Sequence, residues 1–564
     1  MKKDIINYEE LNSLFHWGGE KIWLTDQMSE FIKDYFSITN LERKMKENIN
    51  REKSQFPIMV PESKISDNLF KQIKNIPDLK ISIDKVERIK FSFGMSYWDL
   101  LRLRNGKVKN IIDAVVFPNN VEALKEFLKI ANDNDLCVIP SGGRTSVTEA
   151  IEPILKNKTN IAINMSLMNK ILEFFPDSSI ALVESGIILP DLEKWLNERN
   201  YKFGHSPQSF LLTSIGGAIS AKGAGQFSSL YGNIKNLILD MEVITPIGSI
   251  TNRNLLVPES AVGPNITDLM IGSEGSLGII SKAYLRIRPI MKLNFSSFLF
   301  KTFFDGINAI KEFYQLGLKP SVIRLSDKEE TKLFLRLASN TEEGMIETIF
   351  KEATSFYLKR KGFITDHQCL LVLVFDGIEE INKVQKSKIS AICKSNQGIS
   401  IGESPAKSWY KERYQFPFYR SNFMEHGLLV DTLETATIWS NLPIIYEKVI
   451  SELKQYCLVA MSHISHIYNE GAAIYFTFLT EEDYDWDNPL IKKIRKAILE
   501  IFNKNGATLS HHHGVGNAFK ESLHLEKNLL SFKLLKEIKE SLDPNNILNP
   551  SSGLFRPNIS EKNF

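Results

Sequence analysis

The hydrophobic positions between residues 110 and 139 predict a strand, a helix and a second strand. Residues 111–117 are strand-like, apolar at every position except Asp113, and Pro118 ends them. A second β-rich run covers residues 136–139. Between them, apolar residues recur at helical spacing at Val121, Leu124, Phe127, Leu128 and Ala131. We therefore expect a β-α-β unit in this part of the chain.

The hydrophobic pattern changes after residue 290. Amphipathic segments such as 305–316 alternate with β-rich runs at 370–375 and 472–478. This mixture predicts an α+β domain with an antiparallel sheet. Residues 1–90 are rich in Lys, Asn, Glu and Ile and are interrupted by prolines, which indicates helices joined by extended segments.

Three glycine-rich clusters lie between the β-α-β unit and residue 290. The first is Pro140–Ser146, the second spans 204–233 and the third covers 272–278. Glycines allow main-chain amides to approach an anion or a flat ligand closely. Each cluster taken alone is equally compatible with plain turns, and the first has neither the GxGxxG nor the Walker pattern.

Composition and charge exclude several classes of function. The 564 residues include 69 Lys and Arg against 67 Asp and Glu, so bulk charge gives no argument for nucleic-acid binding. The longest apolar run, 369–375, is far too short to span a membrane. No hydrophobic core of a signal peptide follows the first lysines, so we expect an intracellular, cytoplasmic protein. The four cysteines are scattered without a CxxC pair, which indicates neither a zinc knuckle nor a disulfide framework.

Three adjacent histidines, His511, His512 and His513, are the most conspicuous candidate chemistry. Neighbouring residues on a strand point to opposite faces, so on a strand they could not share one metal ion, and no metal site is predicted. The segment 514–516, Gly-Val-Gly, can bend to hold the imidazoles at a site. Histidine can donate, accept or carry a proton near neutral pH, which indicates acid–base chemistry.

Three further side chains are candidates with two interpretations each. Strand alternation places Tyr475 on the face opposite its neighbours Ile474 and Phe476, where it is either a site residue or a core tyrosine. Arg324 and Arg420 each stand alone among apolar or aromatic neighbours. Such an arginine forms either a structural salt bridge or a bidentate site for a phosphate.

Taken together, the three glycine-rich clusters resemble the flavin-binding domain of the vanillyl-alcohol-oxidase-type superfamily. More narrowly, the chain resembles the alkyldihydroxyacetonephosphate synthase family from Trp17-Gly18-Gly19 almost to its C-terminus. The motifs that carry this resemblance are Phe93-Gly94-Met95-Ser96, Gly204-His205-Ser206-Pro207, Tyr231-Gly232-Asn233-Ile234, Gly263-Pro264, Gly272-Ser273-Glu274-Gly275, Ile323-Arg324-Leu325, Tyr475-Phe476 and 511–516.

The resemblance implies an α+β fold, in which a two-subdomain FAD-binding domain is joined to an α+β cap domain with an antiparallel sheet. We predict an N-terminal, mostly helical segment at 1–90 and the FAD-binding domain at 91–290. The cap, or substrate, domain follows at 291–505. Residues 506–564 form a C-terminal segment that carries the histidine triplet and returns to the FAD domain.

The resemblance also implies non-covalently bound FAD. The residues expected to contact it are Pro140, Ser141, Gly142, Gly143, Arg144, Thr145, Ser146, Gln208, Ser209, Thr213, Ser214, Gly216, Gly217, Ala221, Ala224, Gly232, Asn233, Glu274, Gly275, Leu277, Gly278 and Ile280. Arg144 replaces the third glycine of the family's loop, and Gln208, Ala221 and Ala224 replace Asp, Thr and Ser.

The implied reaction exchanges the acyl chain of 1-acyl-dihydroxyacetone phosphate for a long-chain alcohol, with no net oxidation. By resemblance, Tyr475 is the acid–base group, the three histidines face the flavin, and Arg420 and Arg324 hold the substrate. A homodimer and peripheral contact with a membrane are further expectations. Two alternatives remain at this point, a flavin-dependent dehydrogenase or oxidase of a 2-hydroxy acid such as D-lactate or glycolate, and a catalytically silent flavin- or lipid-binding scaffold.

Overall fold

The computed structural model describes residues 5–6, 58–108, 110–153, 155, 157–252, 255–338, 360, 362–364, 367–425, 427–481, 490–550 and 552. The Trp17-Gly18-Gly19 motif, together with most of the predicted N-terminal segment as far as residue 57, lies outside the described residues. Among the described helices, none has the length and apolar character needed to cross a membrane.

The first sheet contains the predicted β-α-β unit. Its strand order is β3 (Leu79–Ser82), β4 (Ala114–Pro118), β6 (Asn160–Asn164) and β5 (Cys137–Ser141). Strands β4 and β5 both run parallel to β6, and helix α7 (Val121–Asp133) connects them. The apolar face of α7 packs on this sheet, because Leu124, Phe127 and Leu128 are buried with residues of β4 and β6. Shorter elements precede the unit, namely β2 (Ile58–Met59), α4 (Asp67–Lys74), α5 (Lys85–Lys90) and α6 (Tyr97–Arg104).

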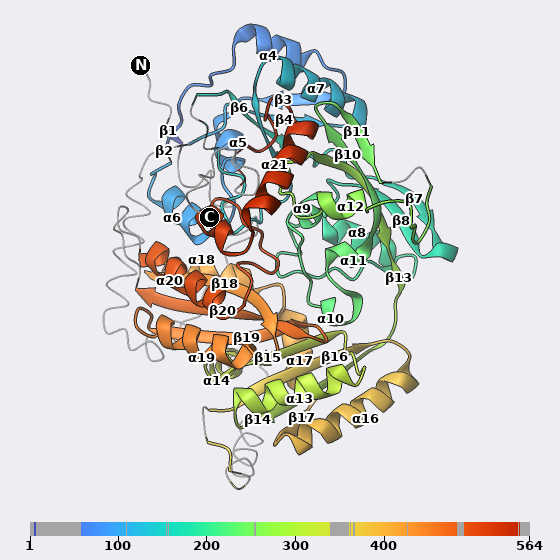
Figure 1. The fold of residues 1–564 in the computed structure, drawn as a ribbon, viewed down its shortest axis with the longest axis vertical. Coiled ribbons are helices and arrows are strands. Elements are labelled where there is room, and N and C mark those ends of the chain that lie inside the picture. Colours follow the sequence, from blue (N-terminus) through green and yellow to red (C-terminus); the bar gives the residue numbers. More distant parts are fainter. Residues whose placement is uncertain are drawn as a thin grey trace.

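The second sheet is antiparallel and follows in the chain. Its order is β11 (Gly248–Thr251), β10 (Ile238–Thr245), β12 (Ile279–Arg286), β8 (Ile180–Glu184) and β7 (Ile171–Phe175). The elements that accompany it are α8 (Leu189–Asn197), β9 (Tyr201–Lys202), α9 (Ile215–Ser220), α10 (Ser228–Tyr231), α11 (Ile234–Leu237), α12 (Ile266–Met270) and β13 (Arg288–Pro289). Figure 1 shows the two sheets together in one half of the molecule.

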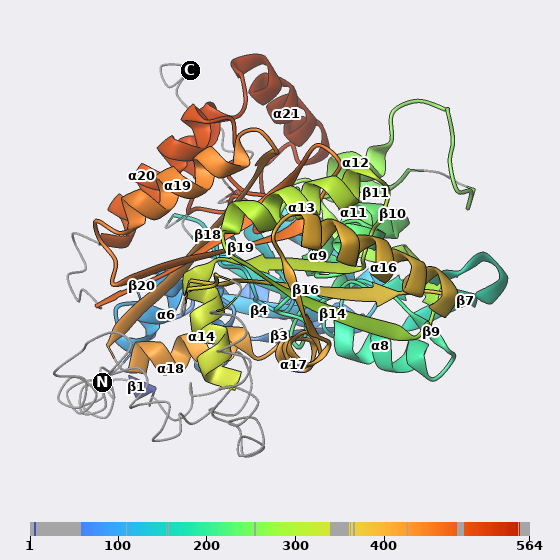
Figure 2. The ribbon, with the colours of Figure 1, turned by 90° about the horizontal axis from the view of Figure 1, so that it is seen from below.

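The third sheet has seven strands, all paired antiparallel, as the pattern after residue 290 predicts. Its order is β17 (Ile399–Gly402), β14 (Leu293–Phe300), β16 (Cys369–Asp376), β15 (Val322–Ser326), β19 (Val459–Ile467), β20 (Gly471–Glu481) and β18 (Leu428–Ile438). Helices α13 (Phe303–Gln315), α16 (Glu379–Ser395), α19 (Leu442–Leu453) and α20 (Leu490–Lys504) cover one face (Figure 2).

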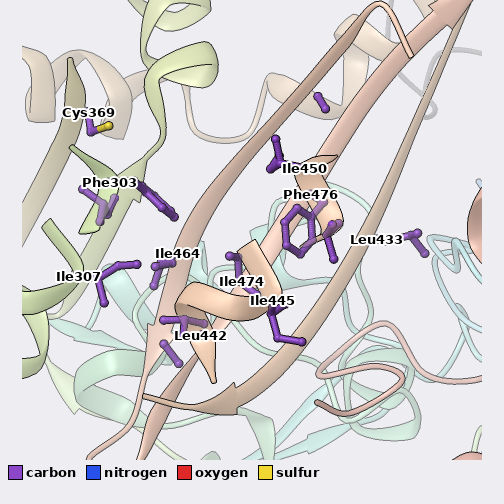
Figure 3. Close-up of a cluster of buried hydrophobic side chains, with 14 of the residues drawn as sticks. Phe303, Ile307, Cys369, Leu433, Leu442, Ile445, Ile450, Ile464, Ile474 and Phe476 are labelled. Atoms are coloured by element: carbon purple, nitrogen blue, oxygen red, sulfur yellow. The ribbon is translucent and has the colours of Figure 1, made fainter. Parts of the chain in front are cut away.

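That covered face forms the largest hydrophobic core. Ile464, Ile474 and Phe476 point from the sheet toward Leu442 and Ile445 of α19 (Figure 3). Because side chains alternate along a strand, the residues between these core positions project from the opposite face. Helices α14 (Lys328–Ala338), α17 (Ser404–Glu412) and α18 (Phe416–Glu425) lie on that opposite face of the sheet (Figure 2).

The C-terminal segment returns to the first two sheets. After the turn η2 (Lys520–Leu525), helix α21 (Leu529–Leu542) lies beside them in Figure 1. Val138 of β5 donates its amide to the carbonyl of Ile547, and its own carbonyl accepts the amide of Asn549. The buried ammonium of Lys539 donates to Asp543 and to two main-chain carbonyls. The chain end is therefore anchored on the strand that leads into the first glycine cluster.

Candidate functional site

A cavity of about 410 Å³ lies between the first two sheets and the face of the seven-stranded sheet that carries α14, α17 and α18. One side of its wall is built from the glycine clusters. The other is built from β15, β18, β19 and β20 together with His512 and His513 of residues 511–516, which we call the histidine segment. The cavity therefore brings together residues that are more than 300 positions apart in the sequence, such as Gly142 and Tyr475.

The first glycine cluster forms a tight loop where β5 ends. Asn164, at the end of β6, donates hydrogen bonds to the carbonyls of Ser141 and Gly142 at 2.8 and 3.1 Å. A Cβ on Gly142 would lie 2.2 Å from Oγ of Ser214, and one on Gly143 would lie 1.7 Å from a main-chain carbonyl. Only glycine fits either position, so the loop packs its backbone directly against the start of α9.

Arg144 adopts a left-handed backbone conformation at φ 59° in this loop. Its guanidinium donates to the carbonyl of Lys90 at 2.9 Å and lies 5.7 Å from the ring centre of Phe91. Arg144 therefore keeps the backbone angle of the glycine that the family has at this position. Its side chain fits because the guanidinium is directed toward α5.

The backbone angle of Arg144 leads to a testable difference between two variants. A residue with a Cβ costs about 1 kcal/mol more than glycine in the left-handed region. Both Arg144→Gly and Arg144→Ala lose the contacts to Lys90 and Phe91, so their comparison isolates the backbone. We expect Arg144→Gly to be more stable than Arg144→Ala by about 1 kcal/mol in urea unfolding. Equal unfolding midpoints would contradict the left-handed conformation.

Most residues predicted to bind the cofactor line this cavity. They are Pro140–Ser146, Gln208, Ser209, Thr213, Ser214, Gly216, Gly217, Ala221, Ala224, Glu274, Gly275, Gly278 and Ile280. Three predicted residues are not part of the wall. Gly232 ends α10 at φ 80°, Asn233 caps α11, and Leu277 is fully buried in a hydrophobic core. Their places in the fold explain these residues without a ligand.

The cavity wall also contains buried polar atoms that lack a hydrogen-bond partner among the described residues. On the side of the glycine clusters they include Oγ of Ser141, both ring nitrogens of His205 and both amide atoms of Gln226. Burial lowers the pKa of His205 to about 4, so its imidazole is neutral. Buried polar groups need hydrogen-bond partners. These atoms and the glycine loop suit a ligand such as FAD, which combines a diphosphate, hydroxyl groups and a flat polar ring.

Tyr475 lies at the centre of a row of side chains across the seven-stranded sheet. In the strand register it pairs with Glu434 of β18 on one side and with His463 of β19 on the other. Its ring stacks on His463 at 5.0 Å and on His512 at 6.2 Å between centroids. The hydroxyl of Tyr475 donates to Oγ1 of Thr432 at 3.1 Å. Burial raises the pKa of Tyr475 to about 12, so the phenol is protonated at neutral pH.

Both predicted arginines line the cavity and both have carboxylate partners. Arg324 lies 2.9 Å from Glu330 and 3.0 Å from Nδ1 of His463. Arg420 pairs with Asp431 at 2.7 Å and donates to two main-chain carbonyls. These contacts use three of the five guanidinium N–H groups of Arg420. The salt-bridge interpretation therefore holds for both residues, and the cavity position keeps the substrate interpretation open.

The histidine segment is held by its backbone from two sides. The carboxylate of Glu434 accepts the amides of His511, His512 and His513 at 2.8–3.1 Å. The carboxylate of Glu274, from the third glycine cluster, accepts the amides of Val515 and Gly516 at 2.6–3.1 Å. A Cβ on Gly514 would lie 2.4 Å from Glu274, so a glycine is required there. The segment thus bridges the two walls of the cavity.

Electrostatics keep these histidines neutral. Burial lowers the pKa of His511 and His513, and it lowers the pKa of His512 to well below its ordinary value. Burial alone would raise the pKa of Glu434, but the main-chain amides that its carboxylate accepts favour the charged form and hold that pKa low, so the carboxylate stays ionised. Neutral imidazoles can accept protons at neutral pH.

The triplet does not lie on a strand, which was the condition of the argument against a metal site. Residues 511–513 form consecutive bends, so their side chains do not alternate between two faces. His512 and His513 line the cavity, whereas His511 lies behind it, with its Nε2 2.7 Å from the hydroxyl of Tyr468. The strand-based argument against a shared metal site therefore does not apply.

Several residues of the site carry no local sequence signal. His463, Glu330 and Thr432 line the cavity, and Glu434 holds the histidine segment. Each depends on which strands are neighbours in the sheet, which hydrophobic alternation does not determine. The available signal is strand alternation. His463 lies next to the core residue Ile464, just as Tyr475 lies next to the core residue Ile474, so both should face away from the core.

Comparisons with known proteins agree with this architecture. A family model described as an FAD binding domain matches residues 112–253, and one described as the C-terminal domain of FAD linked oxidases matches residues 292–552. An alkyldihydroxyacetonephosphate synthase of Dictyostelium discoideum is 30% identical over 496 residues, which cover 86% of this chain and 80% of that protein. The corresponding protein of Trypanosoma brucei brucei is 26% identical over 565 residues, or 98% of this chain and 91% of that protein.

A solved structure of a protein from this family has a similar fold. An alkyldihydroxyacetonephosphate synthase superposes with a TM-score of 0.75 at 27% identity, over 87% of this chain and 86% of that chain. The predicted α+β fold and the FAD cofactor are confirmed by these matches, and the 2-hydroxy-acid dehydrogenase alternative is not favoured. Because the Dictyostelium relative matches at 30% identity over four fifths of its length, the chain belongs to the alkyldihydroxyacetonephosphate synthase family.

Proposed function

We propose that this enzyme exchanges the acyl chain of 1-acyl-dihydroxyacetone phosphate for a long-chain alcohol, in a reaction with no net oxidation. The observation that carries this proposal is a single cavity with two kinds of wall. One wall has the glycine loop and the unpartnered polar atoms that suit FAD, and the other has Tyr475, two arginines and four histidines. When bound, the isoalloxazine ring supplies the nucleophile for the exchange.

Tyr475 is the group that we assign to proton transfer at the substrate carbon. Its raised pKa makes it a proton donor at the start of the cycle, because the phenol holds its proton at neutral pH. The neighbouring imidazole of His513, whose ring centre lies 5.5 Å from that of Tyr475, is neutral and can accept a proton in turn. Stacking on His463 fixes the plane of the phenol ring and so the direction of its hydroxyl.

Arg420 and Arg324 are the groups that we assign to the substrate phosphate. A guanidinium offers planar, paired donors to a phosphate, and Asp431 and Glu330 hold the two guanidinium groups in place. Holding the phosphate in one place orients the bound substrate for reaction, so the chemical step no longer depends on a random encounter.

The finer features of the proposal concern assembly and location. We propose a cytoplasmic homodimer whose long-chain substrates reach the cavity through peripheral contact with a membrane. We also retain the division into an N-terminal segment, an FAD-binding domain, a cap domain and a returning C-terminal segment, with boundaries near residues 90, 290 and 505. Sedimentation of the purified protein, with and without phospholipid vesicles, tests the first two features.

The decisive experiment follows both flavin and product. We expect the purified protein to be yellow with an oxidised-flavin spectrum, and to form alkyl product from acyl-dihydroxyacetone phosphate and labelled hexadecanol. Parallel reactions contain D-lactate or glycolate with an electron acceptor. Reduction of the flavin by a hydroxy acid without ether product would overturn the proposal. A yellow protein inactive in every assay would favour the silent scaffold instead.

A further inference from the structure

Three histidines from two separate segments converge at the wall of the cavity, where two of them line it and the third lies behind. His466 comes from β19, and His511 and His512 come from the C-terminal segment. One ligand nitrogen of each ring lies within 4.8 Å of the corresponding nitrogens of the other two. The Nδ1 atoms of His511 and His512 are 3.0 Å apart. A tetrahedral zinc ion with bonds of about 2.0–2.1 Å holds its nitrogen ligands roughly 3.4 Å apart, so small ring rotations suffice.

The backbone at His466 is distorted in a way that directs its side chain into this cluster. The pairing of β19 with β20 shifts register between Ser465 and Ile467, so His466 is an extra, bulged residue. Its φ of 56° lies in the left-handed region, which is costly for a residue other than glycine. Without the bulge, strand alternation would place His466 on the face opposite Ser465 and away from the other two imidazoles.

Two of the three imidazoles have a second partner that orients them. Oγ of Ser228 lies 2.6 Å from Nδ1 of His466, and the hydroxyl of Tyr468 lies 2.7 Å from Nε2 of His511. Metal-binding histidines in proteins usually have such a partner, which fixes the ring and its tautomer. The partners of His466 and His511 leave Nε2 and Nδ1, respectively, for the centre of the cluster.

We propose that His466, His511 and His512 form a binding site for a divalent transition-metal ion, with zinc as the best-suited probe. Three imidazole ligands favour Zn²⁺ and similar ions over Mg²⁺ or Ca²⁺, which prefer oxygen. The site supplies three protein ligands and leaves a fourth position for water. The proposal concerns a second ligand of the enzyme and does not depend on the identity of its lipid substrate.

Zinc retention by the flavoprotein tests the site directly. The protein is prepared without a polyhistidine tag, stripped with a chelator and dialysed against micromolar Zn²⁺, and bound metal is counted by mass spectrometry. We expect one zinc ion per chain. His466→Asn should lose it, because Asn tolerates the left-handed backbone and can still bond to Ser228 but cannot replace the ring nitrogen. The exposed His524 provides a matched control, so His524→Asn should retain the ion.

A second variant keeps the proposal testable even if His466→Asn fails to fold. Tyr468→Phe leaves all three imidazoles and removes only the hydroxyl bonded to His511. Loss of such a partner typically weakens metal binding by about 10–100-fold, which zinc titration against a chromophoric chelator measures. Cobalt should give a visible absorption band of a tetrahedral site beyond the flavin bands. Zinc binding by the wild type that equals binding by a folded, yellow His466→Asn protein would overturn the proposal, as would no binding at all.

Discussion

Tyr475→Phe is expected to lower kcat for ether formation by about 10³-fold while the protein stays yellow and folded, because general acid–base groups contribute about 10²–10⁴-fold. The substitution removes one hydroxyl and keeps the ring that stacks on His463 and His512. Within the described part of the chain that hydroxyl bonds to Thr432 alone, so its removal disturbs the packing little. Product formation from labelled hexadecanol and the flavin spectrum are the two measurements.

A matched control separates proton transfer from the loss of a buried hydroxyl. Tyr446 carries its hydroxyl 3.3 Å from Asp327 and does not line the cavity, so Tyr446→Phe should leave kcat within a few-fold of the wild type. A Tyr475→Phe enzyme that turns over as fast as Tyr446→Phe would show that Tyr475 is a core residue. A loss confined to KM would instead assign Tyr475 to binding.

Glu434→Ala is expected to destabilise the folded protein by about 3 kcal/mol or more and to abolish activity, because buried donors left without an acceptor cost about 1–3 kcal/mol each. The carboxylate accepts three amides and the hydroxyl of Ser510, and its side chain is 2% exposed. The histidine segment loses its fixed path when this acceptor is removed. Urea unfolding followed by flavin fluorescence measures the effect.

Two comparisons make the Glu434 prediction specific. Glu434→Gln keeps one acceptor oxygen and should lose roughly half as much stability. Glu526 also accepts from the region before the triplet, at the amide of Leu509 and the hydroxyl of Thr508, but it is exposed. Glu526→Ala should therefore cost less than about 1 kcal/mol. If Glu434→Ala and Glu526→Ala unfold at the same urea concentration, the amide contacts of Glu434 do not stabilise the fold.

The sequence predicts the parts of the site that depend on local geometry. Gly142 and Gly143 are recognisable because a tight loop after a strand requires residues without a Cβ. In the structure, a Cβ at these positions would lie 2.2 Å from a hydroxyl oxygen and 1.7 Å from a carbonyl oxygen, respectively. Tyr475 is recognisable because alternation along β20 buries Ile474 and Phe476 on the other face. Both inferences use neighbours within a few residues, where backbone periodicity is reliable.

The residues that sequence reasoning missed depend on long-range register or on a local irregularity. Glu434 binds main-chain amides about 77 residues away, and such contacts leave no side-chain pattern in the sequence. The bulge at His466 reverses the expected face of a strand residue, and no glycine or proline marks it. The bends at the histidine triplet leave no pattern in the sequence, because three identical residues have no periodicity. Bends held by distant carboxylates are determined by tertiary contacts.

The way in which the histidine segment is held has a consequence for protein engineering. The acceptors Glu434 and Glu274 bind main-chain N–H groups, which every amino acid except proline supplies. The loop path is thus fixed independently of the side chains at 511, 512 and 513, while Gly514 and Gly516 must be retained. Libraries randomised at the three histidine positions should preserve folding and flavin content. Natural divergence and directed evolution could then retune reactivity there without first finding compensating stabilising mutations.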